Sequence, residues 1–285
     1  MYQNSFWCKL LFLTSLSVAS PLTNAAEQND VSAKDQEAPE VSSNWQTSIG
    51  IKIHPNRIEG TLGFLVPTAS GLVQTTDASR SGTELTPILF GSVRYKNFFI
   101  SASHFLDTDY NLKLQQAGVA VDINRSETDV NIGYYVLPSL SLSLGYKELK
   151  FGGGLGDGKY SGPVLGVSAF GSMGSGFGLY GSFAYGAVTV KFSGADVPDN
   201  AKKYSYLNYE AGLAYSFDFR ERGGFLNAVT LTLGYRYQSL DSKNALTSQL
   251  VVDSGGGVLV PLGPPSSVHT NNTSRGPVLG VIVSF

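Results

Sequence analysis

The chain of 285 residues carries a formal net charge of −2, and only 15% of its residues are charged. A charge so close to zero gives no electrostatic footprint for nucleic acid, so we expect no nucleic-acid partner. The one cysteine, Cys8, and three histidines far apart in the sequence exclude a disulfide framework and give no spacing for a zinc site. We therefore expect no metal and no cofactor.

The first 26 residues have the layout of a secretory signal peptide. Lys9 precedes a short apolar run at residues 10–18, and small residues follow, with cleavage expected after Ala25 or Ala26. The run is too short for a membrane helix, which needs roughly 20 apolar residues. The acidic stretch 27–43, poor in large apolar residues, predicts a disordered periplasmic leader.

From residue 44 onward, apolar and polar residues alternate. In the stretch 129–149, large apolar residues such as Val130 and Ile132 alternate with polar or small ones, and Pro138-Ser139 interrupts the pattern once. A period of two places the two sets on opposite faces of a strand, and the interruption predicts a tight turn. The same pattern recurs in ten segments, at residues 44–54, 84–95, 98–107, 127–137, 140–149, 161–171, 177–192, 204–219, 226–240 and 276–285.

The connections between these segments alternate in length. Four are short: Lys96-Asn97, Pro138-Ser139, 172–176 and 220–224. Five are longer: 55–83, 108–126, 150–160, 193–203 and 241–275. Transmembrane barrels have short periplasmic turns and long external loops, so the pattern predicts an all-β, antiparallel, up-and-down transmembrane barrel of about ten strands, with both termini in the periplasm. Twelve strands would require a further hairpin inside 57–83 or 110–125.

The chain ends in the sequence GPVLGVIVSF, in which apolar residues fall on one face of a strand and the last residue is aromatic. The outward set comprises Leu279, Val281, Val283 and Phe285. This tail resembles the closing strand of bacterial outer-membrane β-barrels, whose terminal aromatic residue is read by the barrel-assembly machinery. The resemblance covers residues 44–285 and is one of architecture, without the motif of a characterised subfamily. It implies a location in the bacterial outer membrane.

Tyrosine and phenylalanine recur where the strands should leave the lipid, as expected for interfacial girdles. This set comprises Tyr95, Phe98, Tyr134, Tyr146, Phe183, Tyr185, Tyr215, Phe217, Tyr235 and Tyr237.

If the apolar face meets lipid, the charged residues of the opposite face point into the lumen. These are Lys52, Arg94, Asp129, Lys147, Glu210, Asp218 and Arg236. Ten strands enclose little space beyond their side chains, so buried charges should pair. We expect a structural plug that contains the ion pairs Glu210–Arg236 and Asp129–Lys147. A selectivity constriction is the functional alternative.

Candidate catalytic groups are sparse. Asp107 and Asp109 invite comparison with the paired aspartates of ten-stranded omptin proteases, but no Asp-x-His pattern accompanies His269. Ser103 and His104 have opposite parity and therefore point to opposite faces, which argues against a lipid-facing His-Ser pair. We therefore predict no catalytic residue.

Three functions are compatible with these features, in order of preference. The first is a non-enzymatic barrel whose external loops 55–83 and 241–275 form a binding or structural surface. The second is a narrow channel for small solutes, and the third is an outer-membrane hydrolase. Membrane lipid and lipopolysaccharide are the expected surroundings, and the sequence does not indicate an extracellular ligand.

Overall fold

The computed structural model describes residues 45–68, 71–115, 118–153, 157–192, 203–219, 225–242, 246–253, 259–268 and 270–285. The predicted signal peptide and leader, residues 1–43, lie outside this part of the chain, as does the predicted turn 220–224. In the described part, no helix is long and apolar enough to cross a membrane.

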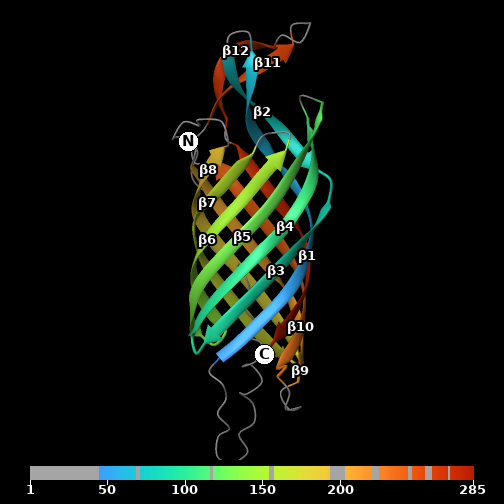
Figure 1. Cartoon of the computed structure of the whole chain (residues 1–285), viewed down its shortest axis with the longest axis vertical. Helices are drawn as coiled ribbons and strands as arrows, with labels where there is room; N and C mark the ends of the chain where they lie inside the picture. The colour runs from blue at the N-terminus through green and yellow to red at the C-terminus, as the bar shows by residue number, and fades with distance from the viewer. Residues whose placement is uncertain are drawn as a thin grey trace, which may run out of the picture.

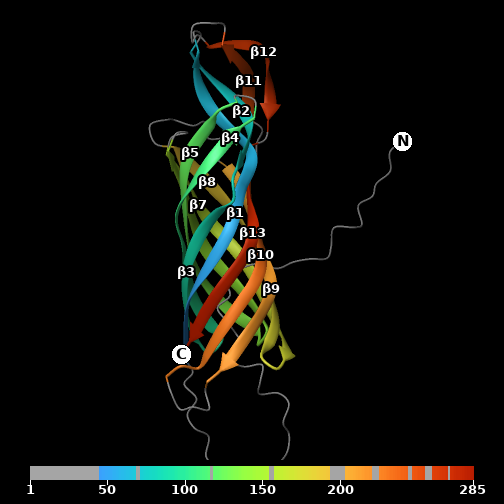
Figure 2. The same ribbon diagram turned by 90° about the vertical axis from the view of Figure 1, so that its right-hand side faces the viewer.

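Ten antiparallel strands close into a barrel, because the first strand pairs with the last. Following the ring from the first strand, the barrel strands are β1 (Trp45–Thr68), β3 (Glu84–Tyr95), β4 (Phe98–Leu114), β5 (Ala120–Leu137), β6 (Leu140–Gly153), β7 (Gly158–Gly174), β8 (Phe177–Phe192), β9 (Lys203–Asp218), β10 (Ala228–Ser242) and β13 (Asn271–Ser284). Figures 1 and 2 show the strands inclined around a tall barrel, with β1 beginning at the end of the barrel where the C-terminus lies. The predicted ten-strand, all-β barrel is confirmed.

Two further hairpins project beyond the barrel at the opposite end (Figure 1). Strand β2 (Gly71–Ser81) pairs with the distal half of β1, and β11 (Leu246–Asp253) pairs with β12 (Leu259–Val268). The prediction of long loops at 55–83 and 241–275 is therefore wrong in part, since both stretches contain paired strands. A hairpin does form inside 57–83, but it lengthens existing barrel strands and adds no eleventh or twelfth member to the ring.

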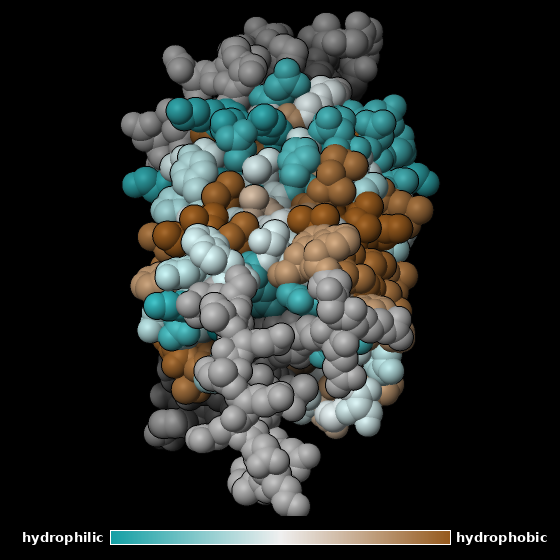
Figure 3. All heavy atoms as spheres, turned by 60° about the horizontal axis from the view of Figure 1, so that its bottom comes forward, coloured by the Kyte–Doolittle hydropathy of each residue, from teal (hydrophilic) through white to brown (hydrophobic). Residues whose placement is uncertain are grey.

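The outer surface carries a belt of exposed apolar side chains. On β1, Ile49, Ile51 and Ile53 are each about half exposed, and leucines and valines continue the belt on the other strands. Figure 3 shows apolar residues around the sides of the barrel and hydrophilic ones gathered beyond them. The run from Trp45 to Ile53 comprises nine residues, which is about the length that a tilted strand needs to cross the hydrocarbon core.

Aromatic pairs lie at the end of the barrel that carries the short turns. Trp45 contacts Tyr95 with a centroid distance of 4.6 Å, and Phe98 contacts Tyr134 at 4.9 Å. These exposed rings extend from adjacent strands, as an interfacial girdle requires.

The lumen is filled by side chains arranged in layers. Near the hairpin end, Leu149, Val188 and Tyr206 belong to a buried apolar cluster. Near the short turns, Phe99 and Tyr135 form a second cluster. Charged residues occupy the space between these layers.

Phe285 closes the seam between the first and last strands at the end of the barrel that carries the short turns. Its backbone exchanges two hydrogen bonds with Thr47, and its ring stacks on Phe225 at 5.6 Å. We expect deletion of Phe285 to lower the fraction of protein that assembles, because the deletion removes both the terminal aromatic and the last contacts of the seam. Heat-modifiable migration in gels measures this fraction, and assembly at the wild-type level would contradict the prediction. Protein that does assemble should retain its function.

Candidate functional site

The β9–β10 hairpin places a glutamate opposite an arginine inside the lumen. Glu210 is the direct cross-strand partner of Arg236, and the ladder continues through Ser216 with Thr230 to Asp218 with Ala228. The Arg236 Nη1 to Glu210 Oε2 distance is 3.5 Å, and both side chains are buried. The predicted Glu210–Arg236 pair and its register are confirmed.

Glu210 also pairs with a second, closer cation, which the pairing of β9 with β10 does not predict. Lys52 Nζ donates to Glu210 Oε1 at 2.6 Å, from a strand three positions away around the ring. Glu210 therefore joins β1, β9 and β10 across the lumen.

A second buried carboxylate, that of Glu127 on β5, is the centre of a network of charged side chains inside the lumen. Lys147 Nζ donates to Glu127 Oε2 at 2.6 Å, and Arg125 Nη2 donates to Glu127 Oε1. Lys147 also donates to Asp129 at 3.0 Å, which confirms the predicted Asp129–Lys147 pair. Glu127 and Lys147 have exposed side-chain fractions of only 2% each. Removal of any one of these charges would leave its partners in a dry interior.

One hydrogen bond of the network spans the full width of the barrel. Gln238 Nε2 on β10 donates to Glu127 Oε1 on β5 at 3.0 Å. In the ring of ten strands, β10 lies five positions from β5 and therefore opposite to it. Side chains from opposite walls thus meet inside the barrel and narrow the lumen at this level.

Aromatic rings cover the cations of the network. The Arg236 guanidinium lies 4.6 Å from the centroid of Phe105, and Lys147 Nζ lies 4.8 Å from that of Tyr206. Such cation–π contacts strengthen when water is excluded. The rings both stabilise the buried charges and fill space around them.

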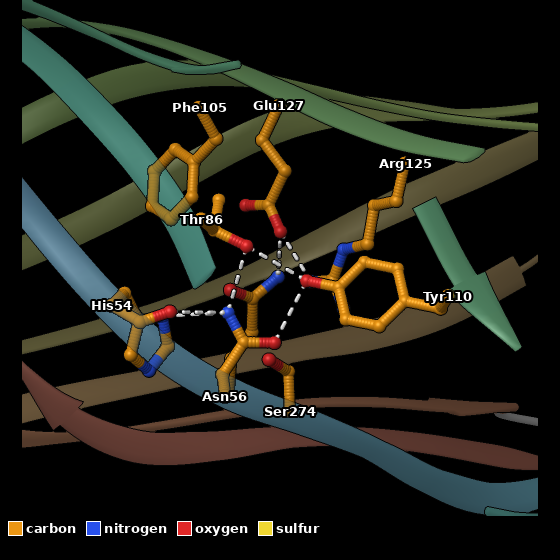
Figure 4. Close-up of a pocket in the computed structure, with 9 residues that line it drawn as sticks. His54, Asn56, Thr86, Phe105, Tyr110, Arg125, Glu127 and Ser274 are labelled. Carbon is orange, nitrogen blue, oxygen red and sulfur yellow. Dashed lines mark hydrogen bonds and ion pairs between the residues drawn. The ribbon is translucent and has the colours of Figure 1, made fainter. Parts of the chain in front are cut away.

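A small cavity of about 10 Å³ remains beside the network. Figure 4 shows Glu127 and Arg125 on one side of it and His54 and Asn56, both from β1, on the other. Tyr110 OH donates to Asn56 Oδ1 at 2.8 Å. A cavity of this size holds about one water molecule, so it does not serve as a solute path.

The charges that line and fill this part of the lumen nearly cancel. The cations are Lys52, Arg125, Lys147 and Arg236, and the carboxylates are Glu127, Asp129 and Glu210. Four positive and three negative groups leave a net charge of +1. Because both signs are paired within the network, the arrangement gives no basis for ion selectivity and matches a structural plug.

The remaining predicted lumenal residues lie closer to the short turns. Arg94 stacks on Tyr135, with its guanidinium 4.1 Å from the ring centroid, and is partly buried. Asp218 is exposed at the end of β9. It has the inward parity, but the strand ends there and leaves it at the rim.

Sequence reasoning missed four polar members of the network: His54, Arg125, Glu127 and Gln238. Parity could have found them. His54 follows Lys52 by two residues, and Gln238 follows Arg236 by two. Glu127 precedes Asp129 by two, and each such step keeps the same face of a strand.

The candidate catalytic groups are not brought together. Asp107 and Asp109 are exposed and lie beside a bulge between Phe105 and Thr108. His104 is exposed and hydrogen bonds to Thr128, whereas Ser103 is buried on the opposite face. His269 lies outside the described residues. Within the described part of the chain, no group of His, Cys, Asp and Glu side chains is placed to hold a metal ion.

The closed ring of strands, the apolar outer belt and the filled lumen define a transmembrane β-barrel of the outer-membrane type. Leu279 and Val281 of the closing strand lie exposed on its outer face, whereas Val283 and Phe285 are half-buried.

Comparison with solved structures finds bacterial outer-membrane proteins. The outer membrane protease OmpT from Escherichia coli is 11% identical, with 87% of this chain and 99% of that chain covered and a TM-score of 0.45. The outer membrane protein AlkL is 10% identical, with 89% and 97% covered and a TM-score of 0.38. Neisserial surface protein A is 12% identical, with 85% and 98% covered and a TM-score of 0.29. No family model and no curated protein matches the sequence.

Proposed function

We propose that the protein is a non-enzymatic outer-membrane barrel with a closed lumen, whose β1–β2 and β11–β12 hairpins form an extracellular binding surface. In this proposal, the signal peptide of residues 1–26 directs export and is cleaved. The observation that carries the proposal is the contact between Glu127 and Gln238 across the barrel, which supports a role other than conduction.

The placement of the hairpins supports the second half of the proposal. Both project from the end opposite the short turns, and β2 contacts β11, so the two hairpins adjoin one another (Figure 2). Paired strands hold their backbone in a defined shape, and a preformed surface loses less entropy on binding than an unstructured loop does.

The test uses intact cells that display the wild-type protein or a variant in which residues 246–268 are replaced by a short turn. Binding to an array of glycans and extracellular proteins is expected for the wild type and not for the variant. A matched control lengthens the Pro138-Ser139 turn at the opposite end and should bind like the wild type. Heat-modifiable migration verifies equal assembly of all three proteins.

An epitope tag inserted between residues 68 and 71 should stain on intact cells, and a tag at Pro138-Ser139 only after permeabilisation. The reverse staining pattern would overturn the orientation. Array binding that is unchanged by hairpin replacement, or absent from wild-type cells, would overturn the binding surface.

A further inference from the structure

Three arginines converge on one glutamate on the outer surface of the barrel. Arg57 Nε and Arg80 Nε lie 2.9 and 3.1 Å from Glu59 Oε1, and Arg275 Nη2 lies 2.6 Å from Glu59 Oε2. The residues come from the neighbouring strands β1, β2 and β13. We refer to Arg57, Arg80 and Arg275 as the arginine cluster, which with Glu59 carries a net charge of +2.

The arginine cluster lies at the edge of the apolar belt. On the outer face of β1, the apolar run that ends at Ile53 is followed by Pro55 and then Arg57. Arg57 pairs with Arg275 across the seam, and Tyr237 is the partner of Arg275 on the other side. Tyr237 stacks on Tyr209 with a centroid distance of 4.9 Å. Outward tyrosines such as Tyr209, which is exposed, and Tyr237, which is half-buried, are typical of the boundary between hydrocarbon and headgroups.

The arginine cluster carries more positive charge than Glu59 can neutralise. Arg57 and Arg275 stand directly opposite one another, and like charges in a cross-strand pair are destabilising. Glu59 accepts one short contact from each guanidinium, but a guanidinium carries five N–H donors in a planar fork. All three side chains remain at least a third exposed, so a ligand can reach them from outside the barrel.

A phosphate group matches both the excess positive charge and the remaining N–H donors of the arginine cluster. It supplies negative charge, and its oxygens accept paired hydrogen bonds from arginine forks. The level of the arginine cluster on the wall is that of lipid headgroups, beside rings that contact the lipid boundary. We propose that the arginine cluster binds a phosphate of an outer-leaflet glycolipid of the lipopolysaccharide class, with Glu59 holding the three side chains in position. Glu59 and Arg80 lie at the base of the β1–β2 hairpin, and the outer-leaflet assignment rests on the extracellular placement of the hairpins in the proposed function.

The test compares binding of bisphosphorylated lipid A to the detergent-solubilised barrel by native mass spectrometry. The variant Arg57→Gln/Arg80→Gln/Arg275→Gln should bind roughly tenfold more weakly or worse, because it loses several charge-assisted hydrogen bonds. Glu59→Gln should bind more tightly than the wild type, since it raises the net charge of the site from +2 to +3. If the arginines served only to pair with Glu59, Glu59→Gln would not bind lipid A more tightly than the wild type.

A second outward cluster provides the matched control. Lys150 and Lys159 flank Glu148 on β6 and β7, so Lys150→Gln/Lys159→Gln removes surface charge elsewhere on the wall. This control should bind like the wild type, and a loss equal to that of the arginine variant would overturn the site. Equal binding of dephosphorylated lipid A would overturn the role of phosphate. Displacement of lipid A by inorganic phosphate at the same concentration would assign the site to free phosphate and overturn the lipid assignment.

Discussion

Replacement of Glu127 by alanine is expected to lower the free energy of unfolding by roughly 3–5 kcal/mol, the cost of breaking a buried ion pair from one side. The substitution removes the acceptor of Lys147, Arg125 and Gln238 together. Lys147 keeps Asp129, but Arg125 and Gln238 lose the only acceptor that the described residues show for their donated hydrogen bonds. Water reaches this level poorly, because the side chains of Glu127 and Lys147 are each only 2% exposed.

Glu148 provides the control for this experiment. It also contacts two lysines, Lys150 and Lys159, but on the exposed outer wall. Glu148→Ala should cost less than about 1 kcal/mol, as solvent-exposed ion pairs generally do. Urea unfolding of the reconstituted barrel, followed by the fluorescence of Trp45, measures both variants. Similar losses for the two variants would mean that water solvates Glu127 as well as it solvates Glu148.

The second large effect is expected from Glu210. Glu210→Gln removes the charge that pairs with Lys52 at 2.6 Å and with Arg236 at 3.5 Å, so we expect a loss of roughly 3–5 kcal/mol. Lys52→Met alone should also destabilise, because it removes the closer of the two cations that pair with Glu210. The double variant should lose less than the sum of the two single losses, with a coupling energy of roughly 0.5–3 kcal/mol.

The same unfolding experiment measures the double-mutant cycle. Glu59→Gln combined with Lys52→Met serves as a control pair, because Glu59 and Lys52 lie on opposite faces of β1 and should show additive losses. Additive losses for Glu210 and Lys52 as well would contradict a direct contact between β9 and β1 through the lumen.

The parity of each strand and the short turns were enough to predict the Glu210–Arg236 and Asp129–Lys147 pairs. These are contacts between neighbouring strands, for which the position of the turn sets the register. The contacts of Glu210 with Lys52 and of Glu127 with Gln238 could not be predicted in this way. They join strands three and five positions apart, and their alignment depends on the tilt and stagger with which the barrel closes.

Strand ends were harder to predict than strand centres, for a physical reason. Within the lipid, the outer face must be apolar, so residues 45–53 alternate clearly. Beyond the lipid both faces can be polar, and β1 continues to Thr68 although the alternation fades after Ile53. Similarly, β2 and β3 pair one after the other with β1, and Gly82-Thr83 separates the two strands. The alternation therefore predicts loops at positions where the structure forms hairpins.

In the proposed function, the contacts of Glu127 with residues from other walls of the barrel seal the lumen. Single-channel recording in planar bilayers tests it most directly, with an open porin reconstituted in parallel to verify insertion. A sealed lumen predicts no stepwise conductance from the wild-type barrel at any applied potential that the bilayer tolerates. Steady, uniform conductance steps from protein whose folding is verified by heat-modifiable migration would contradict the sealed lumen and favour a channel.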